Sequence, residues 1–219
     1  MKVIKISGKK YFLLVIGLII VISIQSFGQN KKKFFFDEFN ISINRTNLKN
    51  ENTEDRFGFG FGIYHSFMSD KKINLIFGFE FNRTRQFKIR MYEGHFAHSS
   101  DLTYKINCLS IPIGVRYNLG HKIKIFVEAG GYADLILSSH RKGTMHTYPP
   151  YKGIQISEID SKAGLSNTFG VYFGIGVRIP ISKYELIIKP NYKYGFKDLY
   201  SYPDEIHNRY FRLSIGIKI

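Results

Sequence analysis

After residue 38, the chain alternates apolar and polar residues in eight separate stretches. A period of two is typical of β-strands that present one face to an apolar environment and the other to a polar one. The pattern predicts strands at about 39–46, 57–67, 72–82, 104–118, 122–137, 167–180, 184–196 and 209–219.

The connections between these stretches alternate between long and short. The short ones have about 5 residues or fewer, and the long ones have about 10 residues or more. Strands joined in this way form an up-and-down barrel with tight turns at one end and long loops at the other, as in outer-membrane barrels. We therefore predict an all-β protein, with an eight-stranded antiparallel up-and-down transmembrane β-barrel at 39–219.

The first 28 residues have the organisation of a signal peptide. Four lysines precede an uncharged apolar run from Tyr11 to Ile24, and the small residues Ser26 and Gly28 precede a cleavage site at Gln29. As a helix, the run is about 21 Å long, which is short of the hydrocarbon core of about 30 Å. We predict a cleaved signal peptide at 1–28 and a periplasmic N-terminal tail at 29–38.

The polar face of the predicted strands combines many glycines with isolated charges of both signs. A narrow lumen needs small residues where the wall is crowded and needs its charges paired, whereas a water-facing surface favours Lys and Glu over glycine. The other face is nearly free of charge, as lipid requires, because a mid-bilayer charge costs about 2–4 kcal/mol. These features favour a membrane barrel over a lipocalin-like one. The predicted lumen charge network is Glu80, Arg116, Glu128, Asp134, Arg178 and Arg212.

Single residues refine this prediction. Cys108, the one cysteine, is expected to be a small inward-facing residue. Pro112 cannot donate a backbone hydrogen bond, which predicts a local bulge. Tyrosines near strand ends predict an interfacial aromatic girdle. These are Tyr117, Tyr192, Tyr194 and Tyr210.

The chain has 32 Lys and Arg against 17 Asp and Glu, a formal net charge of +15. The export signal argues against nucleic acid as the partner. We interpret the surplus as a counter-charge for outer-membrane lipids and lipopolysaccharide, together with lumen ion pairs. The barrel-insertion machinery and other envelope or secretion proteins are further expected partners. With an even strand number, both termini are expected in the periplasm and the long loops outside the cell.

Three segments carry a family resemblance. Leu109–Leu119 (LSIPIGVRYNL), Ile125–Tyr132 (IFVEAGGY) and Tyr210–Ile219 (YFRLSIGIKI) resemble the outer-membrane β-barrel family of Bacteroidota that includes the PorT-like proteins. The resemblance covers essentially the whole mature chain, and its motifs mark wall and turn positions. It implies an eight-stranded outer-membrane barrel and, for PorT-type members, a link to a protein secretion system. This chain ends in Ile219, whereas many such barrels end in an aromatic residue.

Histidines raise two chemical hypotheses. Metal sites usually need three or four ligands, and no nearby carboxylate or cysteine completes the pairs His95 with His98 or His140 with His146. A lipid A-modifying barrel enzyme needs a His with a Ser or an acid near the rim. Such sets arise easily in polar loops, so we predict no catalytic, cofactor or metal site. The candidate catalytic sets are His207 with Asp204 and Ser201, and His140 with Ser138 and Ser139.

The third long connection, Ser139 to Leu165, is the best candidate for an interaction site. It contains a semi-rigid aromatic turn with basic residues nearby, which suits contact with sugars, lipopolysaccharide or a partner protein. A solvated loop without a binding role is the alternative. The candidate residues are Arg141, Lys142, Tyr148, Pro149, Pro150, Tyr151 and Lys152.

The predicted function is that of a non-enzymatic outer-membrane barrel with a filled polar lumen. It would act as an envelope-structural or surface interaction protein through its long extracellular loops. The alternatives are an accessory component of a PorT-type protein secretion system and a lipid A-modifying enzyme.

Overall fold

The structure is a computed structural model that describes residues 35–46, 53–54, 56–68, 71–120, 122–200 and 206–219. The chain divides into a unit at 1–35 and a second unit at 36–219. The predicted signal peptide and the tail up to residue 34 lie outside the described residues. Nowhere in the described ranges does a helix have the length and apolar character needed to cross a membrane.

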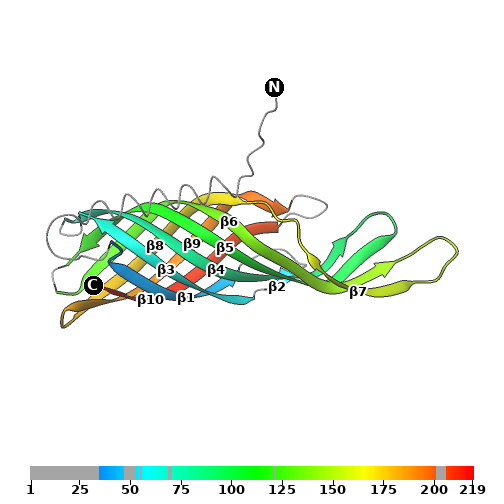
Figure 1. Ribbon diagram of the computed structural model, residues 1–219, viewed down its shortest axis with the longest axis horizontal. Helices are drawn as coiled ribbons and strands as arrows, with labels where there is room; N and C mark the ends of the chain where they lie inside the picture. Colours follow the sequence, from blue (N-terminus) through cyan, green and yellow to red (C-terminus); the bar gives the residue numbers. More distant parts are fainter. Residues whose placement is uncertain (1–34, 47–52, 55, 69–70, 121, 201–205) are drawn as a thin grey trace, which may run out of the picture. The chain divides into compact units, whose positions relative to one another are not determined.

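Eight long antiparallel strands in the second unit form a sheet that closes on itself (Figure 1). Each strand pairs with the long strand before it and the one after it, and the last pairs with the first from Glu38↔Lys218 to Thr46↔Tyr210. This ring confirms the predicted eight-stranded antiparallel up-and-down barrel. The strands are β1 (Glu38–Thr46), β3 (Phe57–Phe67), β4 (Ile73–Tyr92), β5 (Ala97–Leu119), β6 (Lys124–Thr147), β8 (Thr168–Ile181), β9 (Tyr184–Tyr200) and β10 (Ile206–Lys218).

Three neighbouring strands run far past the barrel wall. β4, β5 and β6 have 20, 23 and 24 residues, against 9 in β1. Their far ends continue the sheet and are joined by β7 (Gln155–Lys162), which pairs with β6, and by the short β2 (Thr53–Glu54), which pairs with β4 (Figure 1). We call residues 84–105 and 138–162 the sheet extension.

The prediction of long loops in this region was therefore wrong. The segment from Ser139 to Leu165 is a β-hairpin, in which β6 continues to Thr147 and β7 begins at Gln155. The second long connection is likewise a hairpin of β4 and β5, with a turn after Tyr92. These segments are strands because their backbone N–H and C=O groups form hydrogen-bond ladders with the neighbouring strands.

The polar face of each strand points into the barrel. On β1, Asn40 and Ser42 are buried, whereas Ile41 between them is 70% exposed. The apolar face is continuous around the outside and covers the ten residue steps from Leu109 to Leu119 on β5. At about 3.3 Å per residue and a tilt of about 40°, these steps span about 25 Å, the height of a lipid-facing band. The predicted outward apolar face is confirmed.

The predicted bulge at Pro112 is wrong. Pro112 lies in register opposite Tyr132 on β6. It has no paired residue on β4, but the register between β4 and β5 is the same on both sides of it. A missing N–H removes a hydrogen bond, but it does not require an extra residue in the strand. The register shifts between β5 and β6 lie instead between Ser100 and Thr103 and between Asn107 and Cys108.

Two other single-residue predictions have opposite outcomes. Cys108 faces inward and is fully buried, as predicted. Tyr210 is also fully buried, so its assignment to the outer girdle was wrong. It shares the parity of Arg212, which places both side chains in the lumen.

Candidate functional site

The lumen contains a first ion-pair cluster around Glu80. The Lys193 Nζ lies 2.5 Å and the Arg212 Nη1 2.6 Å from the Glu80 carboxylate oxygens. The Tyr64 hydroxyl donates to the same carboxylate at 2.6 Å and accepts from Arg212 at 2.7 Å. All four side chains are buried, so one carboxylate balances two cations with help from a phenol.

A second cluster surrounds Arg116. Its guanidinium lies 2.7 Å from both Glu38 and Glu128, and Lys189 Nζ lies 3.2 Å from Glu128. The Arg116 guanidinium also lies 4.4 Å from the centre of the Phe126 ring. Polar and aromatic side chains thus fill the interior of an eight-stranded barrel, which is just wide enough to hold them.

The six residues of the predicted lumen network make different contacts in the structure. Glu80, Arg116, Glu128 and Arg212 belong to the two clusters, and Arg178 pairs with the half-buried Glu185 at 3.2 Å. Asp134 makes no ion pair with any described residue and instead accepts a hydrogen bond from Asn208.

The prediction of the lumen network omitted three charged members of the clusters. Lys189 and Lys193 share the polar parity of their strand, so the signal for both was present in the sequence. Glu38 was assigned to the tail, but it is the first residue of β1 and is fully buried. In the sequence, Glu38 follows Phe34, Phe35, Phe36 and Asp37, which do not alternate apolar and polar residues, so the pattern did not place Glu38 in a strand.

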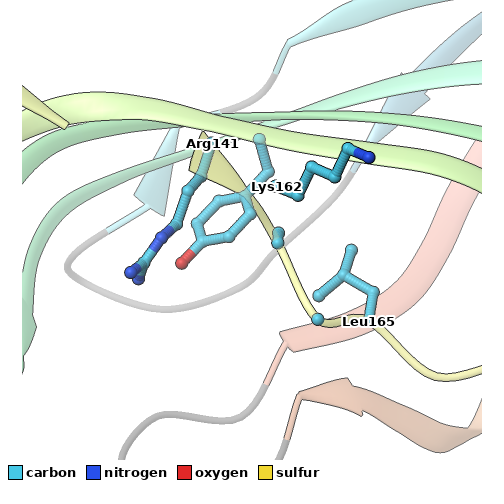
Figure 2. Close-up of a pocket in the computed structure, with 6 residues that line it drawn as sticks. Arg141, Lys162 and Leu165 are labelled. Atoms are coloured by element: carbon cyan, nitrogen blue, oxygen red, sulfur yellow. The ribbon is translucent and has the colours of Figure 1, made fainter. Parts of the chain in front are cut away.

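The buried face of the sheet extension carries an apolar cluster that reaches the end of β9. Met91, Leu102, Ile106 and Leu199 pack together there with Tyr104 and Ile159. Beside this cluster lies a cavity of about 110 Å³, lined in part by Arg141, Lys162 and Leu165 (Figure 2). Ligand pockets usually have about 300–1,000 Å³, so this cavity suits only water or a small ion.

Arg141 and Lys142 lie on opposite faces of β6. Arg141 donates to Glu93 at 2.9 Å and to Ser161 at 3.1 Å, which ties the two hairpins together. Lys142 is exposed and lies 3.2 Å from Asp160, whose pKa is held below its usual value mainly by this hydrogen bond. The two predicted interaction residues therefore do not form one surface.

The described part of the candidate catalytic sets does not form a nucleophile and base. Ser139 Oγ donates to the Ala163 carbonyl, Ser138 accepts from Asn107 at 2.7 Å, and His140 contacts Asp160 instead of either serine. Ser201 and Asp204 lie outside the described residues, as does the His207 side chain. The described residues contain no group of three or more His, Cys, Asp or Glu side chains that could hold a metal ion.

The turns of the two hairpins meet at the far end of the sheet extension. The Tyr148 N–H donates to the Phe96 carbonyl at 2.7 Å. The His98 ring stacks on His146, with centroids 4.6 Å apart, and on Tyr148 at 5.5 Å. The aromatic turn that contains Tyr148, Pro149, Pro150, Tyr151 and Lys152 is thus anchored at its first residue.

This far end exposes six large apolar side chains. Tyr151 at the apex is fully exposed, with a positive φ of 65°. Five further side chains around it are at least 40% exposed. The sequence prediction found only the two tyrosines of the Tyr-Pro-Pro-Tyr turn, because the others lie on segments predicted as polar loops. We call the set the tip patch: Tyr92, Phe96, Tyr148, Tyr151, Ile154 and Ile156.

The stack of His98 on His146 predicts a pH response of the tip. Desolvation, and then the charges of Arg90 and His146, hold the pKa of His98 below its usual value. Because folding lowers the pKa of His98, this residue stabilises the folded tip at pH values above its unfolded pKa of about 6.5. The stabilisation is lost as the pH falls through the lower, folded pKa. Lowering the pH from about 7 to 5 should therefore reduce the protection factors of the amides at 97–100, which are obtained from hydrogen-exchange rates corrected for the intrinsic effect of pH. Arg90→Gln should raise the His98 pKa in an NMR titration, and an unchanged pKa would contradict this explanation.

A family model described as outer membrane protein beta-barrel domain matches residues 27–201. The chain belongs to this family. It is therefore an outer-membrane β-barrel, and the apolar outer face of the wall is the surface that lipid contacts. The match does not extend to the PorT-like group, so that assignment stays a prediction.

One solved structure, that of Neisserial surface protein A, has the same fold, and two others are reported for comparison. Neisserial surface protein A is 13% identical, covers 84% of this chain and 95% of its own, and superposes with a TM-score of 0.50. A major outer membrane protein from Thermus thermophilus is 12% identical over 82% and 97% of the two chains, with a TM-score of 0.46. Ail, the attachment invasion locus protein of Yersinia pestis, is 14% identical over 84% and 97%, with a TM-score of 0.38. No curated protein matches the sequence.

Proposed function

We propose that this outer-membrane barrel is a non-enzymatic surface interaction protein whose sheet extension presents the tip patch to a protein partner outside the cell. The observation that carries the proposal is the tip patch itself, which gathers six exposed apolar side chains at the far end of a paired sheet. Aromatic side chains with a rigid support are typical of binding hot spots. The barrel then serves as the anchor.

The orientation is part of the proposal. Glu38 and Lys218 pair at the same barrel end as the three short connections, between β3 and β4, β5 and β6, and β8 and β9. Outer-membrane barrels keep short turns on the periplasmic side and long connections outside. Both termini would then lie in the periplasm, and the sheet extension would project from the cell.

The interior supports an anchor role over transport. The ion-pair clusters around Glu80 and Arg116 occupy the lumen, and the apolar cluster that contains Leu102 and Ile106 continues the buried face into the sheet extension. The rim residues support a non-enzymatic role, since His140 contacts Asp160 and neither Ser138 nor Ser139.

A photo-activated cross-linking residue at Tyr151 tests the proposal in living cells. It should capture one discrete protein, and a Phe96→Ser/Ile154→Ser background should reduce the yield by about tenfold or more, because hot-spot truncations cost about 2 kcal/mol. The same probe at Lys183, in a short turn, is the control and should capture a different set. Capture that is insensitive to the Phe96 and Ile154 changes would contradict the proposal.

The identity of the captured protein also tests the secretion alternative. A secretion component of the envelope would favour the accessory role that the PorT-like resemblance implies. For the enzyme alternative, His140→Ala should leave the mass profile of lipid A unchanged.

A further inference from the structure

Four basic residues lie side by side across four strands of the sheet extension. The register pairs Arg85 with Lys105, Lys105 with His140, and His140 with Lys162. Directly paired residues on one face of an antiparallel sheet have Cβ atoms about 4.5–5.5 Å apart. We call Arg85, Lys105, His140 and Lys162 the basic row.

The basic row lies on the outer face, just beyond the lipid-facing wall. Arg85, Lys105 and Lys162 are exposed, whereas Gln86 and Tyr104 beside them are buried. The uninterrupted run of outward apolar positions stops four residues short of the row, at Phe81 on β4 and Leu109 on β5, and on β4 Phe87 and Ile89 lie on the same face beyond the row. Four steps along a strand tilted by about 40° raise the row about 10 Å above the apolar band, at the level of lipid head groups.

Among the described residues, one acidic side chain contacts the basic row, and it does so only at His140. Asp160 contacts His140 and Lys142. The side chains of Arg85, Lys105 and Lys162 make no ion pair or hydrogen bond with any residue in the described ranges. Like charges that face each other across strands destabilise a sheet. An arrangement of this kind therefore favours external anions.

A hollow beside the row combines the same charges with apolar side chains. It has a volume of about 510 Å³, and its lining includes Ile136, Leu137, His140 and Lys162. Leu137 is half exposed and continues the lipid-facing wall below His140. Figure 2 shows Lys162 and Arg141 extending in different directions, so Lys162 stays separate from the Glu93 ion pair that holds Arg141.

We propose that the basic row binds the phosphate groups of an outer-leaflet glycolipid of the lipid A type, whose acyl chains lie against the apolar wall. Placement directly above a continuous lipid-facing surface favours a membrane lipid over a soluble anion. The number of adjacent cations favours a head group with more than one phosphate. The proposal uses the orientation given above but not the tip patch, so the two can fail separately.

Native mass spectrometry of the mature barrel in detergent tests the site with an equal mixture of bisphosphorylated lipid A and its phosphate-free form. The wild type should retain the phosphorylated lipid preferentially. The triple variant Arg85→Gln/Lys105→Gln/Lys162→Gln should bind it about tenfold or more weakly, from three lost charge contacts. The matched control Lys71→Gln/Lys72→Gln/Lys122→Gln removes the same charge from exposed positions at the other end and should stay within about twofold.

Each remaining outcome overturns the proposal. Equal retention of the phosphate-free lipid would show that the phosphate groups are not recognised. An equal loss of binding in both triple variants would show that the effect comes from the net charge of the protein and not from the basic row. Equal binding of phosphatidylglycerol would replace lipid A as the ligand. Folding of each variant is verified by its heat-modifiable gel mobility. If the basic-row triple variant does not refold, Lys105→Gln alone should weaken binding about two- to fivefold, and unchanged binding would count against the site.

Discussion

Replacement of Glu80 by Gln is expected to lower the free energy of unfolding of the barrel by about 3–5 kcal/mol. The carboxylate lies within 2.6 Å of Lys193, Arg212 and the Tyr64 hydroxyl, and all of them are buried. A glutamine keeps the size but leaves two cations without a counter-charge in the lumen. Such uncompensated charges dominate the cost of breaking a buried ion pair.

Urea unfolding of the barrel in lipid vesicles, followed by circular dichroism, measures this loss. Glu54→Gln is the matched control, because Glu54 pairs with Arg56 at 3.0 Å while both side chains are largely exposed. It should change the free energy of unfolding by about 0.5 kcal/mol or less. If the Glu80 variant is as stable as the Glu54 variant, the cluster around Glu80 does not stabilise the barrel.

Replacement of Gly176 by Val is expected to destabilise the barrel by about 1–3 kcal/mol through overpacking. A Cβ at position 176 would lie 2.8 Å from Cε1 of the Phe126 ring, which is fully buried. The ring lies 4.4 Å from the Arg116 guanidinium and 5.7 Å from that of Arg178. A side chain at 176 therefore displaces the ring that separates the two cations.

Gly153→Val is the control for this substitution. Gly153 lies in the turn between β6 and β7, and apart from its two chain neighbours no described residue has an atom within 4 Å of a Cβ at this position. Its unfolding midpoint in urea should match that of the wild type, whereas the Gly176 variant should unfold at a lower urea concentration. Equal midpoints for both variants would show that the Phe126 ring can move aside without lowering the free energy of unfolding.

The wall of the barrel was predictable because it depends on local geometry. Successive side chains of any strand point to opposite faces, so Ile41 and Ser42 take opposite environments whatever their partners are. The same parity identified the inward positions of Glu80, Arg116 and Arg212. Fold class and the lumen face followed from this one period.

The sheet extension was not predictable by the same means. On β5, Asp101 adopts a positive φ of 54° within a register shift between Ser100 and Thr103. On β4, the consecutive buried residues Lys88 and Met91 are three positions apart instead of two. Each irregularity inverts the alternation, so a fixed period of two is lost and the segment resembles a polar loop.

The sequence by itself determined the number of barrel strands, the apolar face that meets lipid and the charged parity of the lumen. Only the tertiary structure decided which charges meet, since Arg116 and Glu38 are 78 positions apart and join through barrel closure. It also decided the basic row, because Arg85, Lys105, His140 and Lys162 become neighbours only through the register of four strands. Alternation is a property of one strand, whereas register and closure are properties of pairs of strands and of the whole ring.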